Sequence, residues 1–341
     1  MQDLKMKKVG ITTTVPAEIL YAAGVVPVDM NNLFITAEKY DEYIERAERD
    51  GFPKSMCAWI KGIYGAVLDH KIDTLIGVVE GDCSNTKVLL EVLERKGVKM
   101  IPFGFPHSKD VETMDLQMKS LKNALQVSDE TVEKWRKKLG KIRNLGIELD
   151  ELSYKSNQVS GFENHLLLVS FSDFMNDPDA YEIMLKEKIE EVKNRPAFNE
   201  KVRLGYIGVP PMQGDLFEYL EGMEARIVYN EVQREFMFPR WKESQNLVDQ
   251  YLDYTYPYDL SSRLQDIGKQ VQERSLDAII HYTQAFCHKA AEDMVIKSEL
   301  DIPVLQIEGD KLNVLDARTK LRIEAFVDML KDKKEFDLCV S

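Results

Sequence analysis

The first third of the chain alternates between short apolar runs and longer segments in which apolar residues recur at helical spacing. The runs VVPVDM (25–30), DTLIGVVEGD (73–82) and VKMIPFGF (98–105) are rich in β-branched and aromatic residues, as strands are. Helical segments separate them, for example from about Ala58 to His70 and again over 85–97. Strands that alternate with helices predict a parallel sheet covered by helices.

The spacing changes after residue 110 and changes back after residue 200. Between these points the sequence has long, charged stretches of helical period, such as DETVEKWRKKLGKIRNLGIELDELSYKS. From Lys201 onward strands and helices alternate again, and the strand LDAIIHYTQAFC (276–287) ends in a cysteine. We therefore predict an α/β protein with two Rossmann-like (flavodoxin-like) parallel-sheet domains, residues 1–110 and 201–341, and a helical insert at 111–200.

Composition narrows the classes of function. Of the 341 residues, 44% are hydrophobic and 30% charged, which is the balance of a soluble globular protein. The net charge of −13 argues against nucleic acid as a main partner, because phosphate binding needs clustered Lys and Arg. No apolar run approaches the roughly 18–20 residues that cross a bilayer, and the first residues do not resemble a signal peptide. We expect a cytoplasmic protein that binds neither membrane nor nucleic acid.

The four cysteines are the main candidates for chemistry. None forms a CxxC pair, so any metal ligands must converge through the fold. Cys83 and Cys287 each follow an apolar strand and precede a helix, and ligands of open α/β sheets bind beyond the carboxyl ends of the strands. Cys57 lies at a helix start, where the helix dipole favours a thiolate. We expect Cys339, near the C-terminus, to be inert.

Three thiolates in one cleft would suit an iron–sulfur cluster or a zinc ion. The alternative is that each cysteine is a small buried hydrophobe without chemistry. Position along the chain leaves these interpretations open.

The segments around these cysteines resemble a known family, the cluster-bearing subunits of 2-hydroxyacyl-CoA dehydratases, benzoyl-CoA reductase and double-cubane cluster proteins. The similarity extends over most of the chain. The resemblance implies that Cys57, Cys83 and Cys287 are cluster ligands. The matching segments are TTTVPAEILYAAGVVPVDMNN, FPKSMCAWIKGIYG, VVEGDCSNT, TQAFCHKAAED, IPVLQIEGD and RTKLRIEAFVDML.

The resemblance also implies a cofactor, partners and a reaction. The cofactor would be a 4Fe–4S cluster, or two such units joined by sulfide in a double-cubane 8Fe–9S cluster. An ATP-hydrolysing iron–sulfur activator would deliver one low-potential electron. In dehydratase-type members that electron passes to a thioester carbonyl, and the ketyl radical anion expels the 2-hydroxyl group. A homodimer, or a heterodimer with a related subunit, would act on an acyl-CoA or another small molecule.

Residues beside the cysteines are candidates for supporting roles. Ser84 and Asn85 could bind the cofactor by hydrogen bonds to cluster sulfurs, or could simply cap the helix that follows. Glu80, Gln284 and His288 are candidate catalytic residues, with a packed or solvent-facing His288 as the alternative.

Two further expectations concern residues away from the cysteines. Asn31 and Asn32 are expected to form a turn after the strand VVPVDM, with either a functional role or simple turn chemistry as the reason for these residue types. Trp59 is expected to shield the cluster or to lie in the core.

Three classes of function remain open on the sequence. The first is an oxygen-sensitive, activator-dependent redox enzyme, either a dehydratase-like lyase or a double-cubane reductase. The second is a non-catalytic electron-storage protein with the same three cysteine ligands. The third is a structural zinc protein that uses the cysteines and His288.

Overall fold

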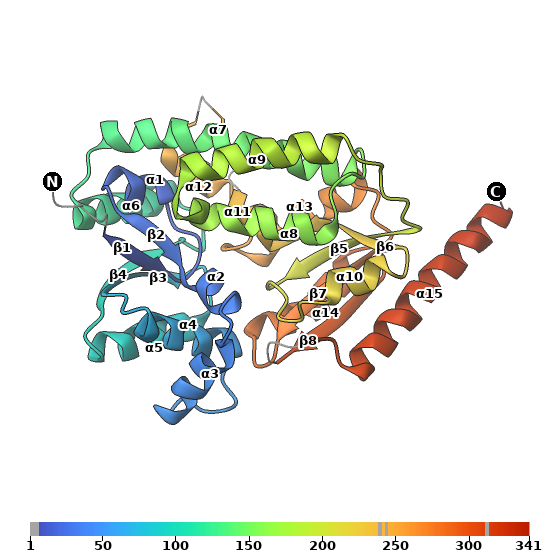
Figure 1. Ribbon diagram of the computed structural model, residues 1–341, viewed down its shortest axis with the longest axis horizontal. Coiled ribbons are helices and arrows are strands. Elements are labelled where there is room, and N and C mark those ends of the chain that lie inside the picture. Colours follow the sequence, from blue (N-terminus) through green and yellow to red (C-terminus); the bar gives the residue numbers. More distant parts are fainter. Residues whose placement is uncertain (1–6, 238–240, 243–244, 311–313, 341) are drawn as a thin grey trace. The chain divides into compact units, whose positions relative to one another are not determined.

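The computed structural model describes residues 7–237, 241–242, 245–310 and 314–340. Its strands form two four-stranded sheets that are parallel throughout, in the orders β2-β1-β3-β4 and β6-β5-β7-β8 (Figure 1). The predicted α/β fold with two Rossmann-like parallel sheets is thus confirmed. The strands are β1 (Lys8–Ile11), β2 (Val26–Asp29), β3 (Thr74–Glu80), β4 (Lys99–Gly104), β5 (Val202–Gly208), β6 (Ala225–Asn230), β7 (Ala278–Gln284) and β8 (Val304–Gly309).

The first sheet is covered by helices because its side chains alternate between two apolar faces. One face packs against helices α1 (Ala17–Ala22) and α6 (Val111–Leu125), burying Val9 and Ile11 of β1. On the other face α5 (Ser84–Arg95) lies so close to β3 that a Cβ on Gly77 would be 2.3 Å from Leu90 Cδ1. Helix α4 (Ala58–Asp69) lies beside α5 and packs against α2 (Met30–Ile35) and α3 (Tyr40–Arg49).

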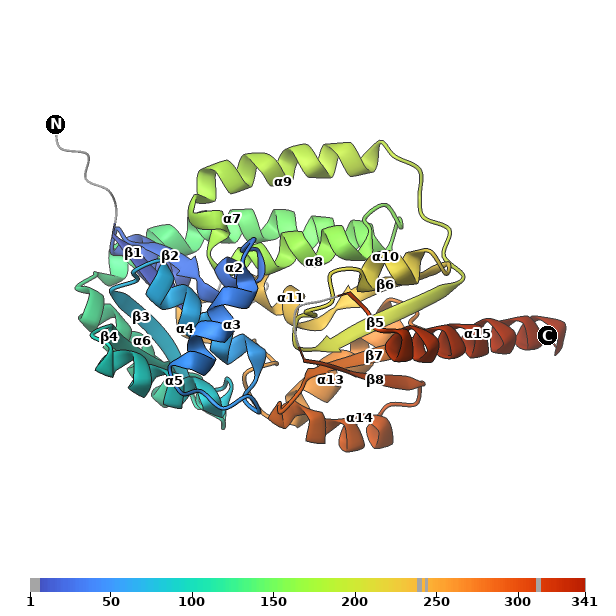
Figure 2. The ribbon, with the colours of Figure 1, turned by 60° about the horizontal axis from the view of Figure 1, so that its bottom comes forward.

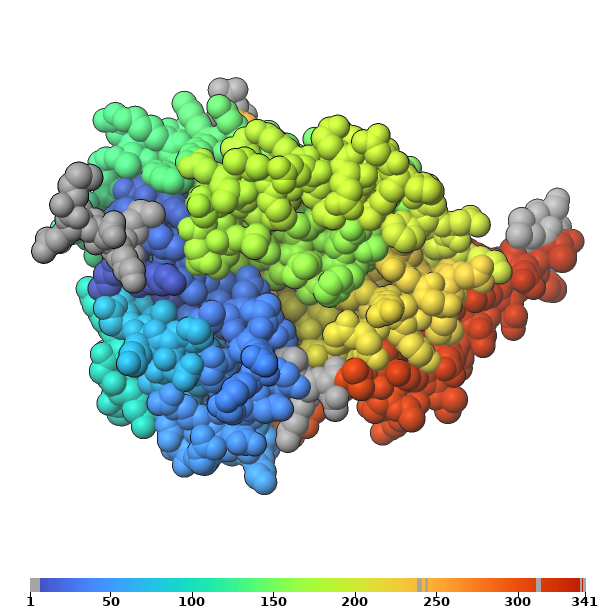
Figure 3. Space-filling view, in the orientation of Figure 1, coloured from blue at the N-terminus to red at the C-terminus, as the bar shows by residue number. Residues whose placement is uncertain are grey.

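The second sheet also has helices on both faces, as Figure 2 shows. Helices α10 (Leu216–Glu221) and α15 (Ala317–Val340) pack on one face. Helices α13 (Leu260–Glu273) and α14 (Asp293–Glu299) pack on the other. The outer side of α15, the red helix at the surface in Figure 3, exposes 68% of both Leu321 and Phe336.

The chain divides into two compact units, and each unit comprises three separate stretches of sequence. The first contains Met1–Ile147, Val169–Glu187 and Glu235–Asp259, and the second contains Glu148–Leu168, Lys188–Arg234 and Leu260–Ser341. The described elements between residues 111 and 200 are all helical, and both units share them. They are α6, α7 (Asp129–Tyr154), α8 (Gly161–Val169), η1 (Ser170–Ser172), η2 (Phe174–Asn176) and α9 (Pro178–Lys193).

The stretch 235–259 contributes aromatic side chains to the core of the first unit. Tyr251, Tyr254 and Tyr258 are buried there, with the strand residues of the first sheet. The Tyr251 hydroxyl donates to the carboxylate of Glu18 on α1 at 2.8 Å. Glu18 also accepts a 2.5 Å hydrogen bond from Arg143 of α7, and the side chains of Glu18 and Arg143 are both buried.

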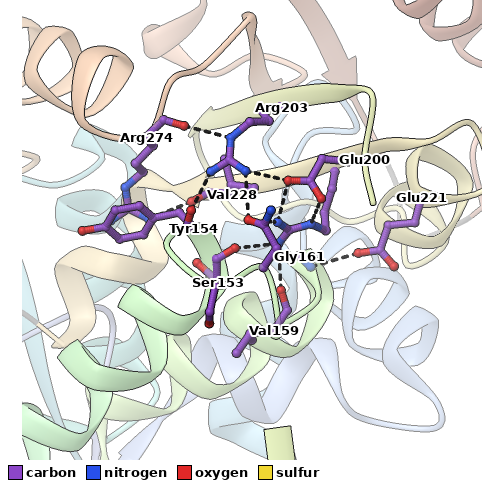
Figure 4. Close-up of polar contacts among 12 residues, drawn as sticks. Ser153, Tyr154, Val159, Gly161, Glu200, Arg203, Glu221, Val228 and Arg274 are labelled. Carbon is purple, nitrogen blue, oxygen red and sulfur yellow. Dashed lines mark hydrogen bonds and ion pairs between the residues drawn. The ribbon is translucent and has the colours of Figure 1, made fainter. Parts of the chain in front are cut away.

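A buried polar network fixes the end of α7 on the second sheet (Figure 4). Arg203 of β5 donates to the carbonyl oxygen of Tyr154 at 2.8 Å. Arg226 of β6 donates to the carbonyl oxygens of Ser153 and Val159 at 2.7 and 2.9 Å. Glu200 accepts from both arginines, so one carboxylate bridges the buried guanidinium of Arg226 and the half-buried guanidinium of Arg203.

The structure contains elements that the sequence pattern did not predict, and it has a helix where the pattern predicted a turn. Strand β1 and helices α2, α11 (Glu231–Met237), α12 (Leu247–Leu252) and α13 are additions. The predicted turn at Asn31 and Asn32 is wrong, because both residues lie in α2, where Asp29 caps the helix by accepting from the Asn31 backbone N–H at 2.8 Å. Within the described ranges, no helix is long and apolar enough to cross a membrane.

Candidate functional site

Cys57 is the N-cap residue of α4, with φ −50° and ψ 132°. Its side chain is buried, and its carbonyl oxygen accepts the first hydrogen bond of the helix, from Lys61 N at 3.3 Å. The ring of Trp59 packs edge-on against Phe34, with ring centroids 5.5 Å apart. The Lys61 ammonium is buried too and pairs with Glu48 at 2.7 Å. The start of α4 is therefore held by packing and by a buried ion pair.

Cys83 is the N-cap residue of α5, with φ −65° and ψ 131°, and it is half-buried. The turn between β3 and α5 depends on Gly81, whose φ is +86°. A Cβ at Gly81 would lie 2.7 Å from Phe105 Cβ and 2.8 Å from the carbonyl oxygen of Pro257. Only glycine fits this conformation in this space. Asp82 then supports the first turn of α5 by accepting from the Thr86 hydroxyl at 3.1 Å.

Cys287 is the N-cap residue of the short helix η3 (His288–Glu292), with φ −84° and ψ 131°. A tight turn precedes it, closed by a 2.9 Å hydrogen bond from Cys287 N to the carbonyl oxygen of Gln284. Phe286 in this turn adopts a left-handed φ of 64° and is exposed. Burial raises the pKa of the Cys287 thiol, although the backbone N–H and the positive charge of Lys289 oppose the rise.

The three cysteines share one local geometry. Each is the N-cap residue directly before a helical segment, with ψ of 131° or 132°, and there the following backbone N–H groups and the helix dipole favour negative charge on sulfur. Cys83 and Cys287 match more closely still. Each lies three residues beyond the last residue of a strand, β3 or β7, that occupies the third place in its sheet.

All four cysteines are present as thiols. Cys57 and Cys83 belong to the first unit and Cys287 to the second. Within either unit, the described residues contain no group of three or more Cys, His, Asp or Glu side chains that could hold a metal ion. The role of the three thiols as cluster ligands therefore stays a prediction.

Comparison with known proteins decides the family. The family model described as 2-hydroxyglutaryl-CoA dehydratase, D-component, matches residues 12–330. The chain belongs to this family. No curated protein matches the sequence. The membership confirms the resemblance to 2-hydroxyacyl-CoA dehydratases and supports a dehydratase-like protein.

The predicted neighbours of Cys83 in this dehydratase-family protein lie close to it in the fold. Ser84 is exposed and Asn85 half-buried, and both lie within the first turn of α5. The alternative that one of them caps the helix is wrong, because the cap position is that of Cys83. Their role in binding a cofactor stays a prediction. Glu80, an exposed residue at the end of β3, accepts from His107 N at 3.1 Å and so ties the loop after β4 to the end of β3.

The predicted neighbours of Cys287 differ in their surroundings. Gln284 is buried, and its amide donates to the carbonyl oxygen of Asp310 and accepts from the Tyr282 hydroxyl at 3.3 Å. These bonds orient the turn before Cys287. His288 is exposed, and burial of part of its ring, together with the charge of Lys289, lowers its pKa. Catalytic roles for Glu80, Gln284 and His288 stay predictions.

Sequence reasoning missed a buried pair of carboxyl groups in the first unit. Asp29, at the carboxyl end of β2, donates its backbone N–H to Asp173 Oδ2 at 2.9 Å, and both residues are buried. Burial and the neighbouring charge of Asp29 raise the pKa of Asp173 to about 7. Burial also raises the pKa of Asp29. The only signal in the sequence is the Asp in VVPVDM, and nothing local connects it to position 173.

Proposed function

We propose that this dehydratase-family protein is an iron–sulfur redox enzyme whose cluster is held by Cys57, Cys83 and Cys287. The observation that carries the proposal is the equivalence of Cys83 and Cys287. The two units have the same strand order, and each has a thiol three residues beyond the same strand. The carboxyl ends of strands are where open α/β sheets bind ligands, and a repeated thiol at that place is unusual for a residue that only fills space.

The donor set fits an iron–sulfur cluster. Cysteine thiolates are the usual ligands of such clusters, and each of these three thiols has the N–H groups of a helix start beside it. Those N–H groups would hydrogen-bond to sulfur and stabilise its negative charge. When bound, a 4Fe–4S cluster on three cysteines would supply low-potential electrons and one open iron that acts as a Lewis acid.

Around such a cluster the chain would provide shape and charge. The Gly81 turn and the Gln284 turn fix where Cys83 and Cys287 enter their helices. The half-buried Lys289 lies beside Cys287, and its positive charge favours the thiolate. These groups would orient the cysteine ligands and offset their negative charge. Glu80 or His288 would donate the proton to the substrate.

The partners we propose are those of the family. An ATP-hydrolysing iron–sulfur activator would donate the electron, and the chain would act as a homodimer or with a related subunit. The substrate would be a 2-hydroxyacyl-CoA ester, dehydrated as in the dehydratases. A double-cubane reductase of small molecules and an electron-storage protein are the alternatives, and they differ in iron content and in turnover.

The first experiment is iron and acid-labile sulfide analysis, with EPR, on protein purified without air. About four irons per chain are expected for a 4Fe–4S cluster, and about eight for a double-cubane cluster. Replacing Cys83 or Cys287 by Ser should remove most of the iron.

Cys339→Ser is the matched control, because Cys339 is an exposed thiol on α15 outside the proposed ligand set. Zinc instead of iron, or full iron content in the Cys287→Ser variant, would contradict the proposal. Dehydration of 2-hydroxyacyl-CoA esters, assayed with an activator and ATP, then separates the enzyme from a storage protein.

A further inference from the structure

The second unit contains a buried ion-pair network at the carboxyl end of its sheet. Arg263 on α13 is only 1% exposed. Its Nε and Nη2 atoms each donate to one carboxylate oxygen of Glu231, both at 2.8 Å, and its Nη1 donates to Glu292. One guanidinium therefore joins two carboxylates from different elements, and we call this set of three residues the Arg263 bridge.

One end of the Arg263 bridge lies at the end of strand β5, and the other lies in the short helix that follows Cys287. Glu231 also accepts from the backbone N–H of Gly208, the last residue of β5, at 2.9 Å. Glu292 is the last residue of η3, the short helix that begins directly after Cys287. The bridge thus connects the end of a central strand to the turn that carries Cys287.

Apolar burial does little to hold this short helix in place. None of the five residues of η3 is buried. A one-turn helix of this length is not stable by itself. Glu292 makes polar contacts instead, to Arg263 and to Lys289, the latter at 3.5 Å. Loss of the bond to Arg263 would loosen η3 from the rest of the unit.

A buried ion pair is an expensive way to stabilise a fold, because two charges lose their hydration. Apolar side chains of similar volume often give equal or greater stability. The Arg263 bridge instead fixes geometry, because a planar guanidinium that donates three hydrogen bonds holds both carboxylates in set positions. This property suits the orientation of a ligand better than it suits bulk stability.

We propose that Arg263 is the positioning residue of the Cys287 thiol, acting through Glu292 and η3. The inference rests on the proposed function, in which Cys287 is a cluster ligand. Arg263 touches neither the thiol nor a substrate in this proposal. It holds the turn from which the thiol projects, so that the sulfur is in place before a cluster binds.

The test compares Arg263→Lys with Arg274→Lys. Arg274, just after the end of α13, is also a buried arginine that bonds to a carboxylate through two nitrogens, and its partner is Asp150. Both substitutions keep the charge and remove the planar fork, so a purely structural role predicts the same outcome for both. Unfolding midpoints should fall in both variants.

Two readouts separate positioning from stability. In the loaded protein, the rate of iron release to EDTA should rise about 10-fold in Arg263→Lys, the loss typical of groups that orient metal ligands, with an altered EPR signal. In the cluster-free protein, the alkylation rate of Cys287 by iodoacetamide, followed by mass spectrometry with Cys83 as internal reference, should change several-fold. Arg274→Lys should match the wild type in both readouts.

Glu292→Gln is the second variant, in case Arg263→Lys does not fold, because it leaves the Arg263–Glu231 pair intact. It should reproduce the effects on iron release and on Cys287 alkylation. Unchanged alkylation and iron release in either variant, or equal changes in Arg274→Lys, would overturn the inference. A wild-type protein that binds no iron would instead overturn the proposed function, while the alkylation rates would still report whether Arg263 positions the Cys287 turn.

Discussion

Replacing Asp29 by Asn should make the stability of the protein less sensitive to pH. Asp173 has a pKa of about 7 in the folded protein, against an ordinary value of 3.8. A raised pKa means that the folded state binds this proton more tightly than the unfolded state does. The stability it contributes is therefore present in acid and is lost as the pH rises from about 4 to about 7.

The magnitude follows from these values. A difference of about three pH units corresponds to about 4 kcal/mol, at about 1.4 kcal/mol per unit. Burial is the larger cause of the shift, and the charge of Asp29 is the second. An amide at position 29 would remove the second cause and the titration of Asp29 itself. We expect Asp29→Asn to gain about 2 kcal/mol in unfolding free energy at pH 8 relative to its effect at pH 5.

The geometry makes this substitution conservative. Asp29 Oδ1 accepts from the Asn31 backbone N–H and side-chain amide, at 2.8 and 2.9 Å, and an amide oxygen can do the same. Asp29 Oδ2 is buried, and hydrogen bonding with the Ser172 side chain lowers the pKa of Asp29. A hydroxyl can accept from an NH₂ group as well as donate to a carboxylate, so an amide at position 29 can keep this contact.

The charge of Asp173 acts on two tyrosines, Tyr21 and Tyr181, and neither is expected to titrate between pH 5 and 8. Burial and the charge of Asp173 raise the pKa values of Tyr21 and Tyr181 far above that range. Arg143, whose guanidinium lies 5.3 Å from the ring centroid of Phe174, stays charged. Asp177 adds to the negative charge near Tyr21.

The assay is urea unfolding followed by circular dichroism at pH 5, 6, 7 and 8. Asp110→Asn is the control, because Asp110 also caps a helix, by accepting from Thr113 N at 2.7 Å. That hydrogen bonding lowers the pKa of Asp110, so its contribution is lost only at more acidic pH. A flat difference between Asp29→Asn and wild type across this pH range, or a loss that grows toward pH 8, would refute the reasoning.

Three further substitutions test packing and charge, each by the free energy of urea unfolding. Gly77→Ala should destabilise by about 1–3 kcal/mol, because its Cβ would overlap Leu90, and an unchanged stability would contradict the close approach of α5 to β3. Gly268→Ala, in helix α13 with open space around the new methyl group, should instead stabilise by about 0.5–1 kcal/mol. Arg143→Met should cost about 3–5 kcal/mol, because the Glu18 carboxylate would remain buried without its cation. Recovery of most of that loss in an Arg143→Met, Glu18→Leu double variant is the check on this cause.

Much of the fold could be predicted from the sequence, because its strands are compact apolar runs between helices of regular spacing. The runs that became β3 and β7 are seven residues long and mostly buried, so each stands out in the sequence as a continuous run of strand-forming residues. Strand β1 is a four-residue run, and α12 is a six-residue helix, too short for a period to stand out.

Some residues of the candidate site could likewise be predicted from the sequence, and others could not. Cys83 and Cys287 could be found because a strand, a cysteine and a helix follow one another along the chain. Asp173 lies 144 residues from Asp29, and Glu292 lies 29 residues from Arg263. Pairs of this kind arise when distant elements pack together, so a local sequence pattern does not predict them.

The division of the first unit into three stretches has a consequence for synthesis. Its core includes Tyr251, Tyr254 and Tyr258, which come much later in the sequence than the strands against which they pack. A ribosome making this chain must release residues up to about 259 before that core can close, by which time two strands of the second sheet, β5 and β6, are already in existence. Domains usually fold in order, with the N-terminal one first. Here the first unit can close only after part of the second unit has been synthesised, and no single cut in the gene would yield either unit as a complete fragment.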